Sequence, residues 1–139
     1  MIDESDPFGR RVAEHLRSDP VVWLTTVAPS GAPQPSPVWF LWDGASSLLM
    51  FSRAGTSRTR NLATNPRVAL NFAGDGRGGD IVVLSGTASV ELERPGDEVV
   101  QAYLEKYTEL MQRLGYEWES FATQYNVPIR ITLTRLRGH

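Results

Sequence analysis

Residues 80–92 read DIVVLSGTASVEL, and this stretch decides the fold class. Apolar and hydroxyl side chains alternate along it, with Val82, Leu84, Ala88 and Val90 expected on one face and Ser85, Thr87 and Ser89 on the other. A period of two residues is typical of a strand that buries only one of its faces. Gly86, in the middle of the run, indicates a β-bulge. The stretch therefore predicts a long antiparallel strand with its apolar face in the core.

Shorter runs of the same kind lie on both sides of this strand. Turn residues at 29–31 and 43–44 separate runs that we interpret as strands at 21–28, 33–42, 48–52, 67–73 and from 128 onward, which makes six strands in all. Helical spacing of apolar residues predicts a leading helix that ends before Pro20 and further helices at 56–64, 99–115 and 117–125. We predict a mainly β protein, an antiparallel β-barrel with flanking helices, in which residues 1–139 form one domain.

Charge is distributed unevenly along the chain. The 14 Lys and Arg residues and the 16 Asp and Glu residues give a net charge of -2, which argues against a nucleic-acid-binding domain. Residues 44–74, however, contain no acidic residue and four arginines, Arg53, Arg58, Arg60 and Arg67. This segment is +4, and the remaining 10 bases and 16 acids make the rest of the chain -6. We therefore expect residues 44–74 to contact an anion.

The composition argues against several other classes of protein. The sequence has no cysteine and only two histidines, His15 and His139, so we expect no metal site. The first residues, MIDESD, are acidic and lack an apolar signal segment, and the densest aromatic run, residues 38–42, is too short to cross a bilayer. We expect a soluble, cytoplasmic protein that binds neither a membrane nor nucleic acid.

The second predicted strand contains three alternating prolines, Pro33, Pro35 and Pro37. Their missing N–H groups all lie on one side of the strand, so that side cannot form an ordinary ladder and must be an open edge. One interpretation is an edge strand protected against pairing with other chains. The other is a gap in the barrel wall, where a planar ligand meets exposed carbonyl groups and the Trp39 ring. The residues alone favour the protected edge.

Two local motifs suggest phosphate binding. Residues 74–79, GDGRGG, match the glycine fingerprint of dinucleotide-binding proteins, but a strand follows them where that fingerprint requires a helix, so a hairpin turn is the better interpretation. Thr56 and Ser57 begin a predicted helix, where free N–H groups favour an anion, and Arg58 adds a positive charge. The alternative is that Ser57 merely caps the helix and the arginines are merely solvated. Both interpretations of this helix start remain open.

No catalytic side chain can be identified from the spacing of residues. His15 is spaced to pair with Asp19 four residues later, but no nucleophile accompanies the pair. No Ser-His-Asp set, carboxylate pair or metal-ligand cluster is recognisable. A binding site without a catalytic side chain is what we expect where a bound cofactor performs the chemistry.

Short motifs along nearly the whole chain resemble those of one known family. They are WLTT at 23–26, G-x-P-x-P-x-PVWF at 31–40, FS at 51–52, R-x-RNL-x-x-NPRV at 58–68, GDIVV at 79–83, AYL-x-KY at 102–107 and R-x-RG at 135–138. In order and spacing they resemble the pyridoxamine 5'-phosphate oxidase-like split β-barrels, and more narrowly the actinobacterial branch that uses the deazaflavin coenzyme F420. The resemblance implies a homodimeric split barrel that binds its cofactor in grooves at the dimer interface.

The resemblance also implies which residues bind the cofactor. They are Ser57, Arg58 and Asn61 at the phosphate, Phe51 and Ser52 along the phosphate and ribityl part, and Pro37, Val38 and Trp39 beside the tricyclic ring. A homodimer is expected on a second ground as well. Trp39, Phe40 and Trp42 put apolar area on both faces of one strand, more than a small barrel is expected to bury alone.

The chain departs from the family members that oxidise pyridoxamine phosphate with FMN. Those carry a further arginine on the second strand, where this chain has Pro35 and Ser36, and a C-terminal Trp/Arg/His motif that residues 133–139 lack. The resemblance therefore favours an F420-dependent oxidoreductase that transfers a hydride between reduced deazaflavin and a small unsaturated acceptor. The alternatives are an FMN-dependent oxidoreductase of the same fold and a flavin- or deazaflavin-binding protein without turnover. The shape of the substrate pocket is expected to depend on residues 74–79 and 115–125.

Overall fold

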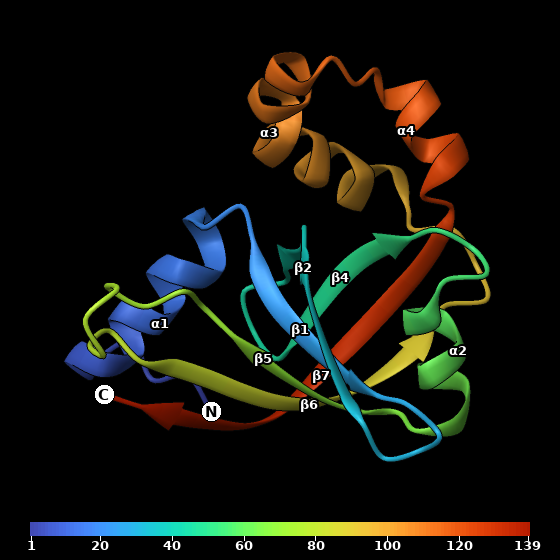
Figure 1. Cartoon of the computed structure of the whole chain (residues 1–139). Coiled ribbons are helices and arrows are strands. Elements are labelled where there is room, and N and C mark those ends of the chain that lie inside the picture. The colour runs from blue at the N-terminus through green and yellow to red at the C-terminus, as the bar shows by residue number, and fades with distance from the viewer.

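One antiparallel sheet forms the body of the protein in the computed structural model, which describes residues 1–139. Its seven strands are β1 (Val22–Val27), β2 (Pro33–Val38), β3 (Leu41–Trp42), β4 (Ser47–Ser52), β5 (Arg67–Asn71), β6 (Val82–Val90) and β7 (Val127–Gly138). They lie in the order β2-β1-β5-β6-β7-β4-β3, and every neighbouring pair is antiparallel. The sheet curls into a half-barrel (Figure 1). The predicted antiparallel barrel with flanking helices is therefore confirmed.

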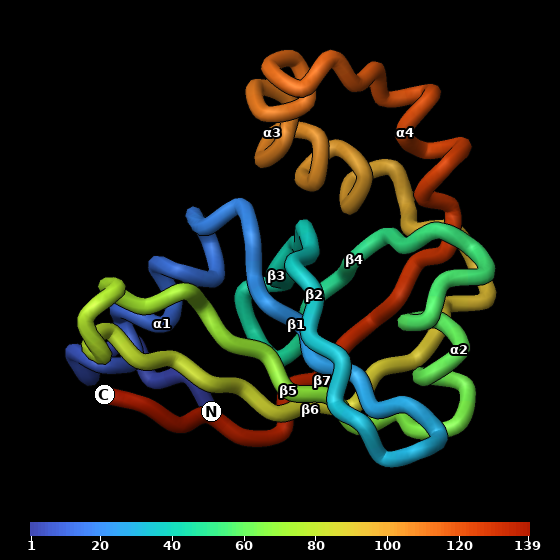
Figure 2. Tube along the Cα trace, in the orientation of Figure 1, coloured from blue at the N-terminus to red at the C-terminus, as the bar shows by residue number.

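Helices flank the half-barrel on three sides. They are α1 (Pro7–Ser18), α2 (Ser57–Thr64), α3 (Asp97–Leu114) and α4 (Trp118–Gln124). In the traces, α1 and α2 lie at opposite ends of the curled sheet, and α3 and α4 form a pair above it (Figures 1 and 2). None of the four helices is long and apolar enough to span a membrane.

The long strand predicted from residues 80–92 is β6, which pairs with β5 on one side and β7 on the other. The register with β7 shifts between Ser85 and Gly86, so the predicted bulge is confirmed. Gly86 is required at this point because a Cβ atom there would lie 2.7 Å from the backbone oxygen of Thr132. The prediction that Val90 faces the core is wrong: the residue is 46% exposed, because it is the last residue of the strand.

The single strand predicted over 33–42 is two strands. Val38, the last residue of β2, pairs with Val22 of β1, whereas Leu41, the first residue of β3, pairs with Leu49 of β4. The strand breaks between them because the N–H of Phe40 donates to a side chain, the hydroxyl of Tyr107 at 2.8 Å, instead of to a neighbouring strand. Residues 39–40 therefore connect the two edges of the curled sheet.

β2 is an edge strand, as its prolines predict. Pro33, Pro35 and Pro37 lie opposite Val27, Thr25 and Trp23 of β1, the only strand with which β2 pairs. The side of β2 that faces away from β1 is thus an open edge, as expected where three N–H groups are missing.

Two hydrophobic clusters lie on opposite sides of the strands that follow β2. The main core fills the half-barrel and includes Phe40 and Trp42. The second cluster lies between the sheet and the α3–α4 pair, and Trp39 and Leu41 pack against it. The argument that a small barrel cannot bury both faces of this segment is therefore wrong, because α3 and α4 of the same chain cover the second face.

Neighbouring residues of α3 hold this helix against the connection between β2 and β3. The Tyr107 hydroxyl, which accepts the Phe40 N–H, also lies 2.7 Å from the carbonyl oxygen of Pro20, to which it donates. Lys106 donates from Nζ to the carbonyl oxygen of Phe40 (2.9 Å) and lies 3.5 Å from the centroid of the Phe40 ring. Burial lowers the pKa of Lys106 to about 8. These contacts fix the backbone on either side of Phe40.

Candidate functional site

Arg58 lies in the first turn of α2, and its side chain joins two strands. Nη1 donates to the hydroxyl of Ser52 on β4 (3.0 Å), and Nη2 donates to the hydroxyl of Ser36 on β2 (2.9 Å). The helix begins at this point because the hydroxyl of Thr56 accepts a hydrogen bond from the N–H of Thr59 (3.3 Å). No acidic residue occupies the first turn, so neither the positive end of the helix dipole nor the guanidinium is neutralised locally.

The guanidinium of Arg58 is a half-buried cation without a counter-ion. Its hydrogen bonds go to neutral serines, its Nε atom is buried with no partner, and none of the ion pairs of the protein includes it. Burial lowers the pKa of Arg58, because the charged form is poorly solvated. Burying a charge without an opposite partner costs stability. This arrangement is therefore suited to receive an anion.

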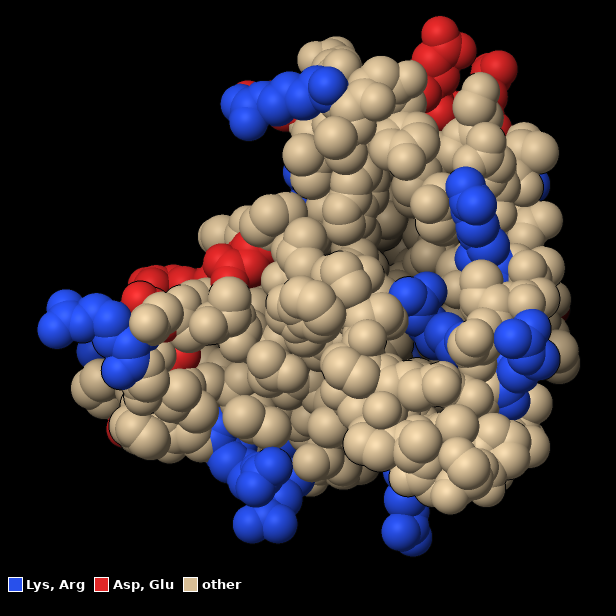
Figure 3. Space-filling view, viewed as in Figure 1, with Lys and Arg blue, Asp and Glu red and all other residues tan.

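A pocket of about 330 Å³ opens beside Arg58. Half of its lining comes from the sheet, the β2–β3 connection and α2, namely Pro37, Val38, Trp39, Phe51 and Arg58. The other half comes from the helical pair and its flanks, namely Tyr103, Leu114, Tyr116, Phe121 and Tyr125. The surface is hollowed between the helical pair and the half-barrel, with basic side chains beside the hollow (Figure 3). The structure thus brings together five of the residues that the resemblance implied.

The Trp39 ring stacks with two other aromatic rings. Its centroid is 4.6 Å from that of Tyr107, with 5° between the ring planes, and 5.6 Å from that of Phe121, with 17° between them. Tyr116 meets the same ring edge-on at 6.4 Å. Because Tyr107 also holds the adjoining Phe40 backbone, α3 determines where the indole lies. The pocket therefore combines an aromatic wall, against which a planar ring system can pack, with a cation.

The other three residues implied by the resemblance do not line this pocket. Ser52 is fully buried and reaches the site through its hydrogen bond with the guanidinium. Ser57 is exposed at the first residue of α2. Asn61 is buried and donates from Nδ2 to Oγ1 of Thr26 (3.0 Å) and Oε1 of Gln34 (2.7 Å), so it ties α2 to β1 and β2.

The remaining arginines of the acid-free segment differ in position. Arg53 lies 5.0 Å from the centroid of the Tyr125 ring, a member of the pocket, and donates to Oε1 of Gln124 (2.9 Å). Arg60 is exposed and donates to the backbone carbonyl of residue 55 (2.5 Å). Arg67 is exposed on β5. Of these three, Arg53 alone contacts a residue that lines the pocket.

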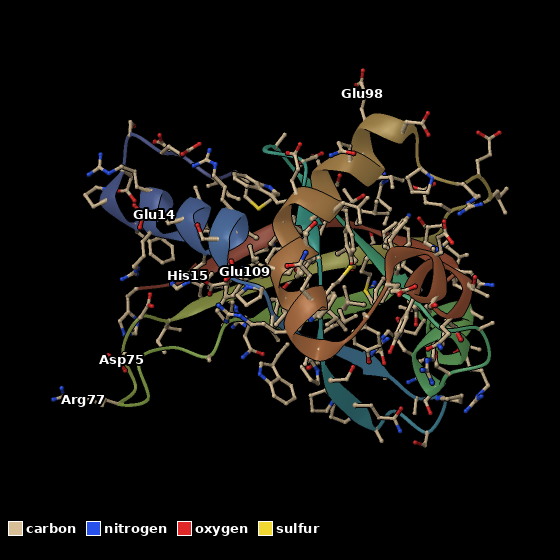
Figure 4. The ribbon with its side chains drawn as sticks, turned by 90° about the horizontal axis from the view of Figure 1, so that it is seen from above. Glu14, His15, Asp75, Arg77, Glu98 and Glu109 are labelled. Carbon is tan, nitrogen blue, oxygen red and sulfur yellow. The ribbon has the colours of Figure 1, made fainter.

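Two other sequence motifs lie away from the pocket. His15 on α1 pairs with Asp19 as its spacing predicts (2.7 Å), and it also meets Asp80, 65 residues later, at 2.9 Å. Burial opposes the charge of His15, but the hydrogen bonds to Asp80 and Asp19 outweigh burial and raise its pKa. The glycine-rich loop 74–79 projects away from the body of the molecule, as the labelled Asp75 and Arg77 show (Figure 4).

The helical half of the pocket contains the residues that sequence reasoning missed. Tyr103 falls within the helix predicted over 99–115 and within the AYL-x-KY motif, and neither gives it a place in the site. The segment 115–125 is predicted to shape the pocket, without any residue of it being singled out. A signal was available in the sequence. Tyr116, Trp118, Phe121 and Tyr125 are four aromatic residues within ten, more than a short surface helix needs for its own burial.

Comparison with known proteins assigns the fold to a family. The half-barrel has the split-barrel fold found in flavin-binding proteins, and a family model described as pyridoxamine 5'-phosphate oxidase matches residues 8–136. The chain belongs to this pyridoxamine 5'-phosphate oxidase family. No curated protein sequence matches it closely enough to count as a relative.

Several solved structures share the fold at low sequence identity. A putative pyridoxamine 5'-phosphate oxidase from Listeria innocua has a TM-score of 0.66 and 23% identity, over 92% of this chain and 94% of that one. An F420 reductase has a TM-score of 0.60 and 24% identity, over 89% of this chain and 94% of that one. The heme storage protein HutZ from Vibrio cholerae has a TM-score of 0.65 and 17% identity, over 93% of this chain and 92% of that one. The shared fold therefore accompanies different functions, so the site must decide among them.

Proposed function

We propose that the protein is a cytoplasmic F420-dependent oxidoreductase that transfers a hydride between reduced deazaflavin and a small unsaturated acceptor. The observation that carries this proposal is the pocket in which the unpaired guanidinium of Arg58 adjoins the aromatic wall formed around Trp39. A cofactor with an anionic tail and a planar ring matches both features. Membership of the pyridoxamine 5'-phosphate oxidase family supports a flavin-type cofactor, and an F420 reductase shares the fold.

In this proposal, Arg58 holds the phosphate of the cofactor. A phosphate oxygen bonded to the guanidinium supplies the counter-ion that the protein lacks, while Ser36 and Ser52 keep the side chain oriented. Trp39 and Phe51 border the ring, and the helical half of the pocket lies across from them. Bound F420 supplies the hydride chemistry, and the protein supplies binding and orientation.

The single cation beside the proposed phosphate position favours a phosphodiester, as in F420, over a phosphomonoester, as in FMN. Arg58 is the one cation among the residues that line it, and the neutral Ser36 touches the guanidinium from β2. The phosphate of F420 is a diester with a single negative charge, whereas that of FMN is a monoester with roughly -1.5 to -2 charges at pH 7. One guanidinium neutralises the diester. An FMN would need a second cation, for which Arg53 beside Tyr125 is the candidate.

We also propose that the protein forms a homodimer through the outer face of the sheet. Trp23 on β1 points outward with 39% of its surface exposed, and it pairs in register with Pro37 and Asn71. Ala69 and Ser85 continue this surface with small, uncharged side chains, and the exposed Arg67, Arg135 and Arg137 border it. An exposed tryptophan among such residues is typical of a surface that a partner covers. Since Pro37 also lines the pocket, a second copy on this face would adjoin the cofactor.

Two titrations test the cofactor. Fluorescence quenching of the purified protein is measured with F420 and with FMN, and we expect saturable binding of F420 that is tighter than that of FMN. Saturable FMN binding without F420 binding would overturn the proposal in favour of the FMN-dependent alternative. Oxidation of reduced F420 is then followed across a panel of unsaturated acceptors. A rate above that of buffer supports an enzyme, and tight binding without turnover supports a cofactor-binding protein instead.

Light scattering at micromolar concentration tests the dimer. We expect a dimer for the unmodified chain and a monomer for Trp23→Glu, because the variant buries an unpaired carboxylate in the proposed interface. A monomeric unmodified chain would contradict the dimer without bearing on cofactor binding by Arg58.

A further inference from the structure

A second, larger pocket of about 550 Å³ lies on the other side of α4. It is lined by Phe51, Arg94, Pro95, Val100, Trp118, Glu119, Ala122, Thr123, Tyr125, Asn126 and Pro128. Phe51 and Tyr125 also line the pocket beside Arg58, so these two rings form the wall between the pockets. Its volume falls within the range of about 300–1,000 Å³ that is usual for small-molecule sites.

The second pocket contains an unpaired charge of each sign. Arg94 comes from the connection between β6 and α3, and Glu119 comes from the first turn of α4. Both residues are exposed, and the side chain of neither takes part in an ion pair or a hydrogen bond; the Thr123 hydroxyl donates to the backbone carbonyl of Glu119. The two charges are therefore free to bind groups of opposite sign on one ligand. This distinguishes the second pocket from the first, whose one charged residue is Arg58.

Aromatic rings provide the apolar part of the second pocket. The Phe51 and Trp118 rings meet edge-on with their centroids 6.4 Å apart. Trp118 also stacks on Phe121 at 5.9 Å, and Tyr125 stacks on the same ring at 4.5 Å. Because packing inside the α3–α4 cluster holds these rings, they present preformed surfaces against which an aromatic ligand can pack.

We propose that this pocket binds an aromatic zwitterion of amino-acid size. The carboxylate of the ligand pairs with Arg94, its ammonium group pairs with Glu119, and its ring packs against Phe51, Trp118 and Tyr125. A phosphorylated ligand is disfavoured, because Glu119 repels an anion that carries no compensating positive charge. The inference does not rest on the cofactor, although the shared wall of Phe51 and Tyr125 places the two ligands next to each other.

Three related probes test the charge requirement. L-Phenylalanine carries both charges, 3-phenylpropionate carries the carboxylate alone, and 2-phenylethylamine carries the ammonium alone. Their binding is measured by isothermal titration calorimetry to the full chain and to Arg94→Gln and Glu119→Gln. Matched controls are Arg77→Gln and Glu98→Gln, which replace exposed, unpaired charges that point away from the body of the molecule (Figure 4).

We expect L-phenylalanine to bind saturably and to bind about fivefold more weakly to either pocket variant, the usual effect of one exposed charge pair. Binding of 3-phenylpropionate should be weakened by Arg94→Gln alone, and binding of 2-phenylethylamine by Glu119→Gln alone. The control variants should bind like the unmodified chain. The proposal would be overturned if L-phenylalanine did not bind saturably, or if the control variants weakened its binding as much as the pocket variants. It would also be overturned if Arg58→Ala weakened this binding and neither pocket variant did.

Discussion

Replacement of Arg58 by alanine is the most direct test of the proposed cofactor site. A hydrogen bond to a charged group contributes about 1.5–3 kcal/mol, so its loss should raise the Kd for F420 by roughly 10- to 150-fold. The effect can be attributed to the ligand because Arg58 has no carboxylate partner in the protein. Its removal therefore leaves no buried acidic group unpaired.

The same substitution should have a small effect on the free energy of unfolding. The variant loses the hydrogen bonds from Arg58 to Ser36 and Ser52, but it also avoids burial of a cation without a counter-ion. These two contributions oppose each other, so we expect a net change below about 1.5 kcal/mol. Urea denaturation of the free protein measures this quantity, and it separates a binding defect from a folding defect.

Fluorescence quenching by F420 provides the binding assay, and Arg60→Ala is the matched control. Arg60 lies two residues further along α2, is exposed, and bonds to a backbone carbonyl. If positive charge acted only in a general way, both substitutions would weaken F420 binding alike. The proposed site instead predicts that Arg60→Ala changes the Kd for F420 by less than about threefold. A folded Arg58→Ala variant whose Kd stays within about threefold of the unmodified value would refute the assignment of Arg58 to the phosphate.

Three further predictions concern stability. Tyr107→Phe deprives the buried N–H of Phe40 of its acceptor, so urea denaturation should reveal a loss of about 1–3 kcal/mol. The pKa of His15 is raised in the folded protein, so its contribution to stability is fully present below its pKa in the unfolded chain, about 6.5, and is lost as pH rises through its pKa in the folded protein. The free energy of unfolding of His15→Gln, measured by denaturation at several pH values, should therefore fall less over this pH range than that of the unmodified protein. Gly86→Ala places a Cβ atom 2.7 Å from a backbone oxygen of β7, so its Tm should fall.

Each stability prediction has a control. Tyr116→Phe removes a hydroxyl that forms no hydrogen bond within the protein, and equal losses for it and Tyr107→Phe would contradict the role of the buried hydroxyl. Parallel pH profiles for His15→Gln and the unmodified protein would show that the imidazole is not linked to stability. Gly96→Ala adds a Cβ atom that meets nothing within 4 Å at a φ of -63°, and an equal fall in Tm would rule out the steric reason given for Gly86.

The parts of the fold that depend on local patterns could be predicted from the sequence. The alternation of side chains in β6 and the glycine at its bulge are visible within a few residues. The break between β2 and β3 cannot be seen in the local sequence, because the group that causes it, the Tyr107 hydroxyl, lies 67 residues beyond Phe40. The carboxylate that completes the His15 cluster is equally remote, at Asp80.

The candidate site, too, could be predicted from the sequence only in part. Arg58 was suggested by a helix start within a segment free of acidic residues, and both features are local. Its isolation from every carboxylate is a property of the folded chain, as is the approach of Tyr116 and Phe121 to Trp39. The shape of the pocket, and the second pocket behind Phe51, required the position of the α3–α4 pair.

The strand order also determines when the sheet can be completed during synthesis. β2, β1, β5 and β6 can pair as soon as residue 90 has emerged, but the β3–β4 hairpin joins them through β7, which spans Val127–Gly138. Until residues 127–138 are made, the nascent chain therefore holds two unconnected pieces of sheet. The edges of β4 and β6 that later flank β7 stay unpaired for that interval, so a ribosome paused before residue 127 would expose them to aggregation.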